Sequence, residues 1–147
     1  MGNRAVITAS KAYDVSESND IGVYLHWNGG RDSVEAFLLY CELKGYRAPD
    51  SDNYGWARLC QVIGNFFGGT TSVGIDKCHS LDCNNFDNGT YIIKGWKIVD
   101  RKYFKGSEQT EHDLLGMLEA INDAQPARER LPYDTLVAAA EKENCHV

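Results

Sequence analysis

The sequence predicts an α+β fold in which an antiparallel sheet, built from two β-hairpins, packs against two to four helices. Three observations lead to this prediction. Segments rich in β-branched and aromatic residues occur in adjacent pairs, apolar residues at helical spacing separate the pairs, and no strand–helix–strand unit repeats. The chain has 147 residues, 43% of them hydrophobic, and is long enough to bury a core. We expect one domain over residues 1–125, followed by a C-terminal appendage over 126–147.

The first hairpin is expected to join residues 4–9 to residues 21–27, because both segments are β-branched or aromatic. Asn28-Gly-Gly ends the second strand, and Asp32 with Glu35 then forms a capping-box pattern that predicts a helix start. This helix carries one apolar stripe and closes at a left-handed glycine; the residues concerned are Val34, Phe37, Leu38, Cys41 and Gly45.

A second amphipathic helix is expected over residues 56–67, where apolar side chains again recur at helical spacing until two glycines end the pattern. Residues 70–76 alternate like a strand. Residues 90–104 are expected to form a long strand in which Gly95 marks a bulge or bend, and these two strands together predict the second hairpin.

A third helix is expected to begin at a cap formed by Thr110 and Asp113, and to end before Pro126. Its inward side chains are Leu114, Leu115, Leu118 and Ile121. Residues 132–143 predict a short final helix in the C-terminal appendage.

Composition and motifs exclude several classes of protein. No apolar run approaches the roughly 20 residues that cross a bilayer, and the first residues lack a secretory signal, so we expect a cytoplasmic protein with no membrane partner. The five cysteines are an odd number and predict no disulfide framework. The phosphate-loop, dinucleotide-binding, serine-hydrolase and zinc-protease patterns are all missing from the sequence.

The junction between the second strand and the first helix is the most distinctive candidate site. His26, Trp27, Asn28, Arg31 and Asp32 place aromatic, amide and cationic groups where helix N–H groups could bind an anion. A structural alternative is that the glycines only turn the chain and Asp32 only caps the helix. Three aromatic or basic residues of the second helix could complete a ligand site here: Tyr54, Trp56 and Arg58.

Two further chemistries rest on histidines. His26 could act as a general base oriented by Asp32 or Glu35, although a strand histidine is more often a hydrogen-bonded structural residue. Cys78, His79 and Cys83 could supply zinc ligands, but the spacing lacks the second cysteine pair of structural zinc sites. We therefore expect no cofactor and no enzyme activity, and keep a small hydrolase or nuclease as a third hypothesis.

Charge is distributed unevenly along the chain, whose net charge is −6. Basic and aromatic residues interleave over 94–105, including Lys97, Arg101 and Lys102, a composition that suits nucleic acid. The last part of the chain is acidic and includes Glu108, Glu111 and Asp113, a composition that suits a basic surface on a protein partner. Each charged region also has an explanation that needs no partner. The basic residues over 94–105 could simply form the solvent-facing side of a strand, and the acidic residues could simply keep the protein soluble.

Three segments carry a resemblance: Gly2-Asn-Arg-Ala-Val-Ile7, Val23-Tyr-Leu-His-Trp-Asn-Gly-Gly30 and Asn53-Tyr-Gly-Trp-Ala-Arg58. Together they resemble a group of small proteins that prophages and mobile elements of Gram-positive bacteria encode, and the likeness covers roughly residues 2–105. No catalytic residues follow from it. The resemblance implies a genetic context in which compact, acidic proteins often resemble anti-CRISPR and other anti-defence proteins.

The leading functional hypothesis is therefore a phage-encoded anti-defence protein. It would inhibit a host defence protein complex, such as a CRISPR-Cas nuclease, by stoichiometric binding, with nucleic acid as the less favoured partner. The alternative is a protein that binds or sequesters a small molecule or nucleotide at the strand-to-helix junction over residues 26–32.

Overall fold

The structure is a computed structural model and describes residues 2–69 and 72–144. Strands and helices alternate in short groups along the chain. In order, the elements are β1 (Ala5–Thr8), the 3₁₀ helix η1 (Val15–Glu17), β2 (Ile21–Leu25), α1 (Arg31–Leu43), α2 (Asn53–Phe66), β3 (Val73–Lys77), η2 (Cys78–Ser80), β4 (Thr90–Lys94), β5 (Lys97–Lys102), α3 (Leu114–Ala124), η3 (Ala127–Glu129) and α4 (Tyr133–Asn144).

The five strands form one mixed sheet in the order β3-β2-β1-β4-β5. The pairs β1–β2, β2–β3 and β4–β5 are antiparallel, whereas β1 and β4 run parallel at the centre of the sheet. The α+β class is thus confirmed, but the prediction of a purely antiparallel sheet is wrong. A parallel pair needs a long connection, here through β2, α1, α2 and β3, and local sequence patterns do not indicate such pairings.

The predicted long strand over residues 90–104 is wrong, because the chain folds back within it. β4 ends at Lys94, which pairs with Lys97 across a turn in which Gly95 has a φ of +60°. A positive φ favours glycine and suits a tight hairpin. The bulge falls instead between Ile92 and Ile93. The expected strand over 70–76 is described from residue 73 onward and pairs with β2 rather than with β4; residues 70 and 71 lie outside the described residues.

Helix ends follow the predicted chemistry only in part. α1 begins at Arg31 with Gly30 as its N-cap, so the capping box of Asp32 and Glu35 is wrong. Gly45 closes α1 with a φ of +73°, as expected. α3 begins after Asp113, whose carboxylate accepts the Gly116 N–H at 2.9 Å, so the cap lies three residues beyond Thr110.

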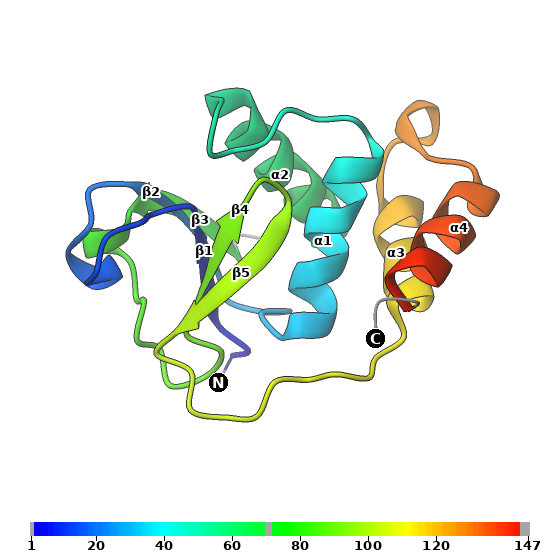
Figure 1. Ribbon diagram of the computed structural model, residues 1–147. Helices are drawn as coiled ribbons and strands as arrows, with labels where there is room; N and C mark the ends of the chain where they lie inside the picture. The colour runs from blue at the N-terminus through cyan, green and yellow to red at the C-terminus, as the bar shows by residue number, and fades with distance from the viewer. Residues whose placement is uncertain (1, 70–71, 145–147) are drawn as a thin grey trace.

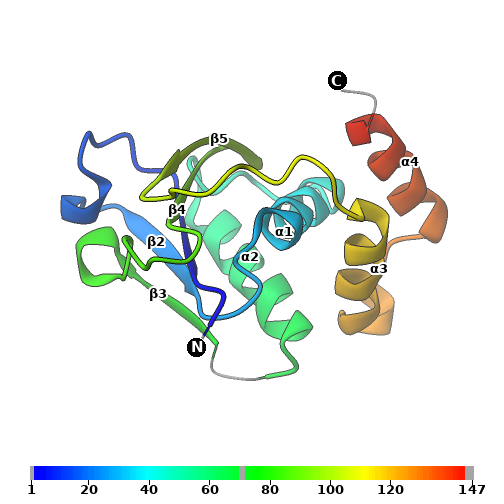
Figure 2. The same cartoon turned by 90° about the horizontal axis from the view of Figure 1, so that it is seen from below.

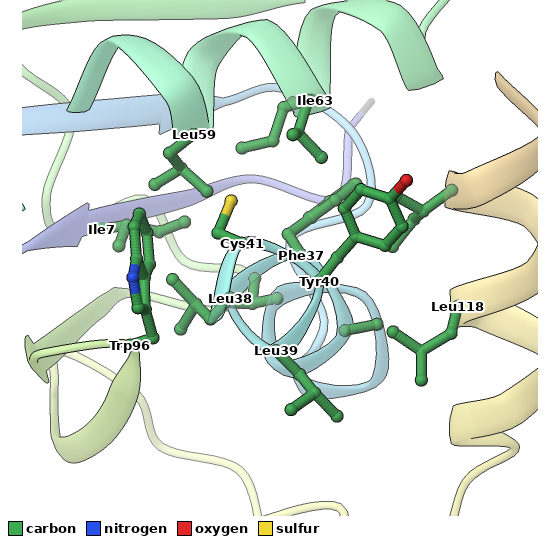
Figure 3. Close-up of a cluster of buried hydrophobic side chains, with 14 of the residues drawn as sticks. Ile7, Phe37, Leu38, Leu39, Tyr40, Cys41, Leu59, Ile63, Trp96 and Leu118 are labelled. Carbon is green, nitrogen blue, oxygen red and sulfur yellow. The ribbon is translucent and has the colours of Figure 1, made fainter. Parts of the chain in front are cut away.

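The helices form two layers on one face of the sheet (Figures 1 and 2). α1 and α2 lie against the strands, and α3 with α4 covers the side of α1 that faces away from the sheet. The core therefore surrounds α1. Figure 3 shows its side chains meeting Ile7 of β1, Leu59 and Ile63 of α2, Trp96 of the β4–β5 turn and Leu118 of α3.

This arrangement explains why α1 is apolar beyond its predicted stripe. Leu39 and Tyr40 are also buried, and the Tyr40 hydroxyl donates to Asn122 Oδ1 of α3 at 2.7 Å. The final helix is confirmed as α4, and three of its side chains join the same core: Leu136, Ala139 and Ala140.

The opposite face of the sheet carries a smaller apolar cluster beneath two connections. Val6 and Ile92 come from the strands, whereas Val15, Cys78 and Cys83 come from the segments over 9–20 and 78–89. Asn85 is fully buried in the second segment. Within the described residues, none of the helices is both long enough and apolar enough to cross a membrane.

Candidate functional site

A strap over residues 103–113 connects β5 to α3 and passes the N-terminal end of α1 (Figures 1 and 2). It contains no helix or strand, and its residues from 105 to 111 are all exposed. Gln109 Oε1 accepts the Asp32 N–H at 3.3 Å. The strap thereby brings charged side chains to the first turn of α1.

Arg31, the first residue of α1, lies between two carboxylates. Its Nε donates to Glu35, one turn along the helix, and its Nη1 lies 2.8 Å from Glu108 Oε2 of the strap. Burial alone would lower the pKa of Arg31, but the hydrogen bonds and charges of Glu35 and Glu108 raise it above its usual value. Arg31 is therefore a fixed cation at the groove between α1 and β5.

Arg101 of β5 is the second cation of this site. Its guanidinium is stacked between the rings of Tyr91 and Phe104, at 3.9 and 3.8 Å from their centroids. Its Nη1 contacts Glu108 Oε1, and its Nη2 donates to the Asn88 carbonyl oxygen at 2.7 Å. Only 9% of its side chain is exposed, so rings and backbone fix the plane of the guanidinium.

A histidine–carboxylate pair lies beside the two arginines. His112 Nε2 lies 3.2 Å from Glu35 Oε2, so Glu35 contacts both Arg31 and His112. His112 lies 77 residues along the chain from Glu35. No local pattern could have paired it with Glu35, because the contact depends on the path of the strap.

Two cavities meet at Arg31. One, of about 270 Å³, is lined by Arg31, Arg101, Glu108 and the chain from Ile98 to Asp100. The other, of about 190 Å³, is lined by apolar side chains of α1, α3 and the β4–β5 hairpin and by four charged residues, namely Arg31, Glu35, Lys97 and Glu143. We call Arg31, Glu35, Arg101, Glu108 and His112 the arginine cluster. Forked guanidinium groups beside open space suit recognition of a carboxylate or phosphate.

Neither a protein-family model, nor a curated protein, nor a solved structure matches the chain.

The structure separates the residues of the predicted ligand site. Tyr54, Trp56 and Arg58 lie in the first turns of α2, and Tyr54 and Arg58 line a hollow with Tyr46, which follows the C-terminal end of α1. The junction over 26–32 includes the N-terminal end of α1, whereas this hollow lies at the other end of the helix, about 20 Å away over 13 residues. Trp56 is also buried.

Within the junction, the polar groups mostly satisfy one another. His26 Nδ1 lies 2.9 Å from the Tyr24 hydroxyl, so His26 is paired with a tyrosine rather than with Asp32 or Glu35. Asn28 has a φ of +56° and donates to Ser33 Oγ at 3.1 Å. Asp32 Oδ1 accepts the Ser33 N–H, so Asp32 and Gln109 already occupy N–H groups that an anion would need. Trp27 remains 46% exposed.

The basic and aromatic residues of 94–105 are largely engaged within the protein. Trp96 is buried and donates to the Tyr46 carbonyl oxygen at 2.9 Å. Lys97 lies between Glu42 at 3.2 Å and Glu143 at 3.1 Å, and Lys102 lies 3.5 Å from Asp100. The interleaved pattern therefore reflects internal packing and ion pairs more than a continuous basic surface.

The three acidic residues singled out in the sequence have different roles. Glu108 belongs to the arginine cluster, and Asp113 caps α3. Glu111 is exposed and forms no ion pair with the described residues. Only Glu111 of the three is thus available to a partner without a change in the fold.

The suggested zinc ligands do not gather into a metal site. Cys83 Sγ donates to the Cys78 carbonyl oxygen at 3.4 Å, and both thiols are buried. The two thiols also interact with each other: the Cys83 thiol lowers the pKa of Cys78, whereas the Cys78 thiol, together with burial, raises the pKa of Cys83. His79 is exposed and lies beside Ser80. Across residues 2–69 and 72–144, no three His, Cys, Asp or Glu side chains are grouped to hold a metal ion.

Proposed function

We propose that this chain acts by stoichiometric binding to a protein partner, as an anti-defence protein that inhibits a host immune effector. A CRISPR-Cas nuclease is the candidate effector. The observation that carries the proposal is a set of unpaired carboxylates on the outer helical layer. We call these residues the outer acidic surface: Glu119 and Asp123 of α3, and Asp134 and Glu141 of α4.

The spacing of these residues puts each pair on one side of its helix. Glu119 and Asp123 are four residues apart, and Asp134 and Glu141 are seven apart, so each pair shares a helix face. Asp123, Asp134 and Glu141 are exposed, and none of the four forms an ion pair with the described residues. Like charges four residues apart slightly destabilise a helix. For Glu119 and Asp123 this cost favours a role outside the fold, whereas Asp134 also suits the positive N-terminal end of α4.

The charge of the whole C-terminal part points the same way. Residues 107–147 contain nine acidic and three basic side chains. A negative field of this kind attracts basic surfaces over about 10 Å at moderate salt, and nucleic-acid-binding proteins present such surfaces. A partner that normally holds nucleic acid is therefore the kind of protein this surface fits.

The test is an affinity pull-down of the tagged protein from a bacterial lysate that contains an active CRISPR system, followed by mass spectrometry and repeated after nuclease treatment. One effector should be recovered in stoichiometric amount and should survive the nuclease. Recovery of nucleic acid alone, or of nothing, would contradict the proposal.

Charge reversal then tests the surface. Glu141→Lys should weaken the complex roughly tenfold at low salt, since it removes an attractive charge and adds a repulsive one. Glu17→Lys is the matched control, because Glu17 is exposed in η1 and the substitution changes the net charge equally. Equal weakening by both variants would show that only net charge matters. Glu108 and Asp113 are unsuitable for this test because both support the fold.

The alternative, a small-molecule or nucleotide site at residues 26–32, retains one supporting observation. Trp27 is half exposed, and the ring of His26 lies 5.1 Å from its ring in an edge-on arrangement. A nucleotide at 100 times its dissociation constant would add about 2.7 kcal/mol of stability and raise the melting temperature. Trp27→Ala should abolish that shift, and a panel of nucleotides that leaves the melting temperature unchanged would remove the alternative.

A further inference from the structure

Two buried polar atoms among the described residues lack a hydrogen-bond partner, and both belong to the arginine cluster. They are Arg101 Nε and His112 Nδ1. The two side chains are only 9% and 10% exposed. Buried polar atoms are almost always paired in folded proteins, so the hydrogen bonding of this cluster is unusually incomplete.

The Glu108 carboxylate already shows what kind of group fits between the two arginines. One of its oxygens contacts Arg31 Nη1 and the other contacts Arg101 Nη1, so a single anion bridges two guanidinium groups. A phosphate group presents oxygens in a similar arrangement and carries more negative charge. It could form the same contacts and leave oxygens for further donors.

Arg101 is held ready for such a group. The rings of Tyr91 and Phe104 enclose both faces of its guanidinium, so it can bind an anion only through its edge. Because its orientation is already fixed, little side-chain entropy is lost on binding. This is the usual condition for a specific anion site rather than a surface ion pair.

Glu108, in contrast, is in a position to be replaced. Its side chain is 37% exposed, and it belongs to a strap whose neighbouring residues are all exposed. The 270 Å³ cavity lies directly beside it and is lined by both arginines. Once Glu108 is displaced, Glu35 is the one carboxylate among the described residues that still contacts either arginine, which leaves an excess of one positive charge to attract an anion. Asp100 also lines the cavity, but its charge is balanced by Lys102 at 3.5 Å.

We propose that Arg31 and Arg101 form a binding site for the phosphate group of a small phosphomonoester, which takes the place of the Glu108 carboxylate. The ester's apolar body would occupy the adjoining 190 Å³ cavity, which Leu38, Leu39 and Trp96 help to line. This site is separate from the outer acidic surface and does not depend on the proposed partner.

Isothermal titration calorimetry at fixed ionic strength tests the site, with inorganic phosphate and phenyl phosphate as probes. Glu108→Gln should bind inorganic phosphate about tenfold more tightly than the native protein, because the competing carboxylate is gone. Glu111→Gln is the matched control, since it removes an exposed, unpaired carboxylate three residues along the same strap and should leave the affinity unchanged.

Arg101→Lys should weaken phosphate binding about tenfold, because an ammonium group cannot present a fixed fork. If that variant does not fold, Arg31→Lys serves the same purpose at a more exposed position. Phenyl phosphate should bind more tightly than inorganic phosphate if the apolar cavity receives the ester body.

Three results would overturn the proposal. The first is equal phosphate affinity in Glu108→Gln and the native protein, which would make Glu108 a purely structural bridge. The second is an equal gain in the Glu111→Gln control, which would show a general charge effect. The third is equal affinity for the two probes, which would overturn the assignment of the apolar cavity. None of these results bears on the pull-down, so the two proposals fail independently.

Discussion

Two connections of nearly equal length, residues 78–89 and the strap over 103–113, are held in contrasting ways. The first is organised around the buried side chain of Asn85. Its Nδ2 donates to the carbonyl oxygens of Asp82 and Gly89, both at 3.0 Å, and its Oδ1 accepts the N–H groups of Asp87 and Gly89 at 3.1 and 3.0 Å. All four of these Asn85 hydrogen bonds run to backbone groups within residues 78–89.

The strap is held mainly by side chains that reach other elements. Glu108 contacts Arg31 and Arg101, Gln109 accepts one N–H of α1, and His112 meets Glu35. Bonds between a buried amide and backbone leave no room for a competitor, whereas ion pairs at a half-exposed carboxylate can exchange with a dissolved anion. The contrast separates a structural connection from one suited to binding.

The largest expected effect is the loss of Asn85. Asn85→Ala should lower the free energy of unfolding by about 3–4 kcal/mol, because several backbone groups would lose their partners in a buried site. Urea denaturation measures the change. Asn84→Ala is the matched control at the exposed neighbouring position and should stay within about 0.5 kcal/mol of the native value. A similar loss of unfolding free energy in both variants would show that Asn85 does not organise the 78–89 segment.

Amide hydrogen exchange should show the next largest difference. The Gly89 N–H is bonded to buried Asn85, whereas the Asp32 N–H is bonded to exposed Gln109 at 3.3 Å. We expect Gly89 to exchange at least about a hundredfold more slowly than Asp32 after correction for intrinsic rates, because only larger openings expose it. Comparable protection of the two amides would show that the strap is as firmly held as the 78–89 segment.

Removing the charge of Glu108 should cost less. Glu108→Gln should lower the free energy of unfolding by about 1 kcal/mol, since partly exposed ion pairs contribute little and the amide oxygen can still accept a hydrogen bond. The loss should shrink in 1 M salt, where the Debye length is about 3 Å. Glu111→Gln should change stability by less than this in either buffer, and a salt-independent loss would contradict an electrostatic role.

The smallest effect is a pH dependence within the 78–89 segment. The Arg4 side chain donates to Asp87 at 2.7 Å, and this hydrogen bond, with one from the Arg4 N–H, holds the pKa of Asp87 below its usual value. The resulting stability is present above the ordinary aspartate pKa of about 3.9 and is lost as the pH falls through the lower folded value.

Asp87→Asn should therefore be less stable than the native protein at pH 5, by less than about 1 kcal/mol, and the two should converge as the pH falls well below the ordinary aspartate pKa. Urea unfolding across this range measures the difference. A constant difference at all pH values would contradict the role of the carboxylate charge.

Local signals in the sequence predict much of the fold. The spacing of Val34, Phe37 and Cys41 identifies α1, because a helix buries every third or fourth residue. The end of α1 is identified by Gly45, because glycine readily adopts the positive φ that closes a helix. The split of residues 90–104 was missed because Gly95 suits a bulge and a hairpin turn equally well, and only the pairing partner decides between them.

The candidate site was less accessible to prediction. Arg31, Arg101 and Glu108 were each singled out, but for three different reasons, and nothing local indicated that one carboxylate bridges both guanidinium groups. The contacts depend on the path of the strap, and that path depends on where α3 packs against α1. The contact between Glu35 and His112 could not be predicted for the same reason.

The parallel pairing of β1 with β4 has a consequence for synthesis on the ribosome. Val6 pairs with Thr90, so one side of β1 remains unpaired while the chain through β2, α1, α2 and β3 is translated. At about 5–20 residues per second, that wait lasts several seconds. β2 follows β1 closely and can pair with its other side, but a nascent chain exposes the β4 side of β1 to neighbouring chains until the crossover is complete. A chaperone that binds extended apolar segments would find this protein during that interval.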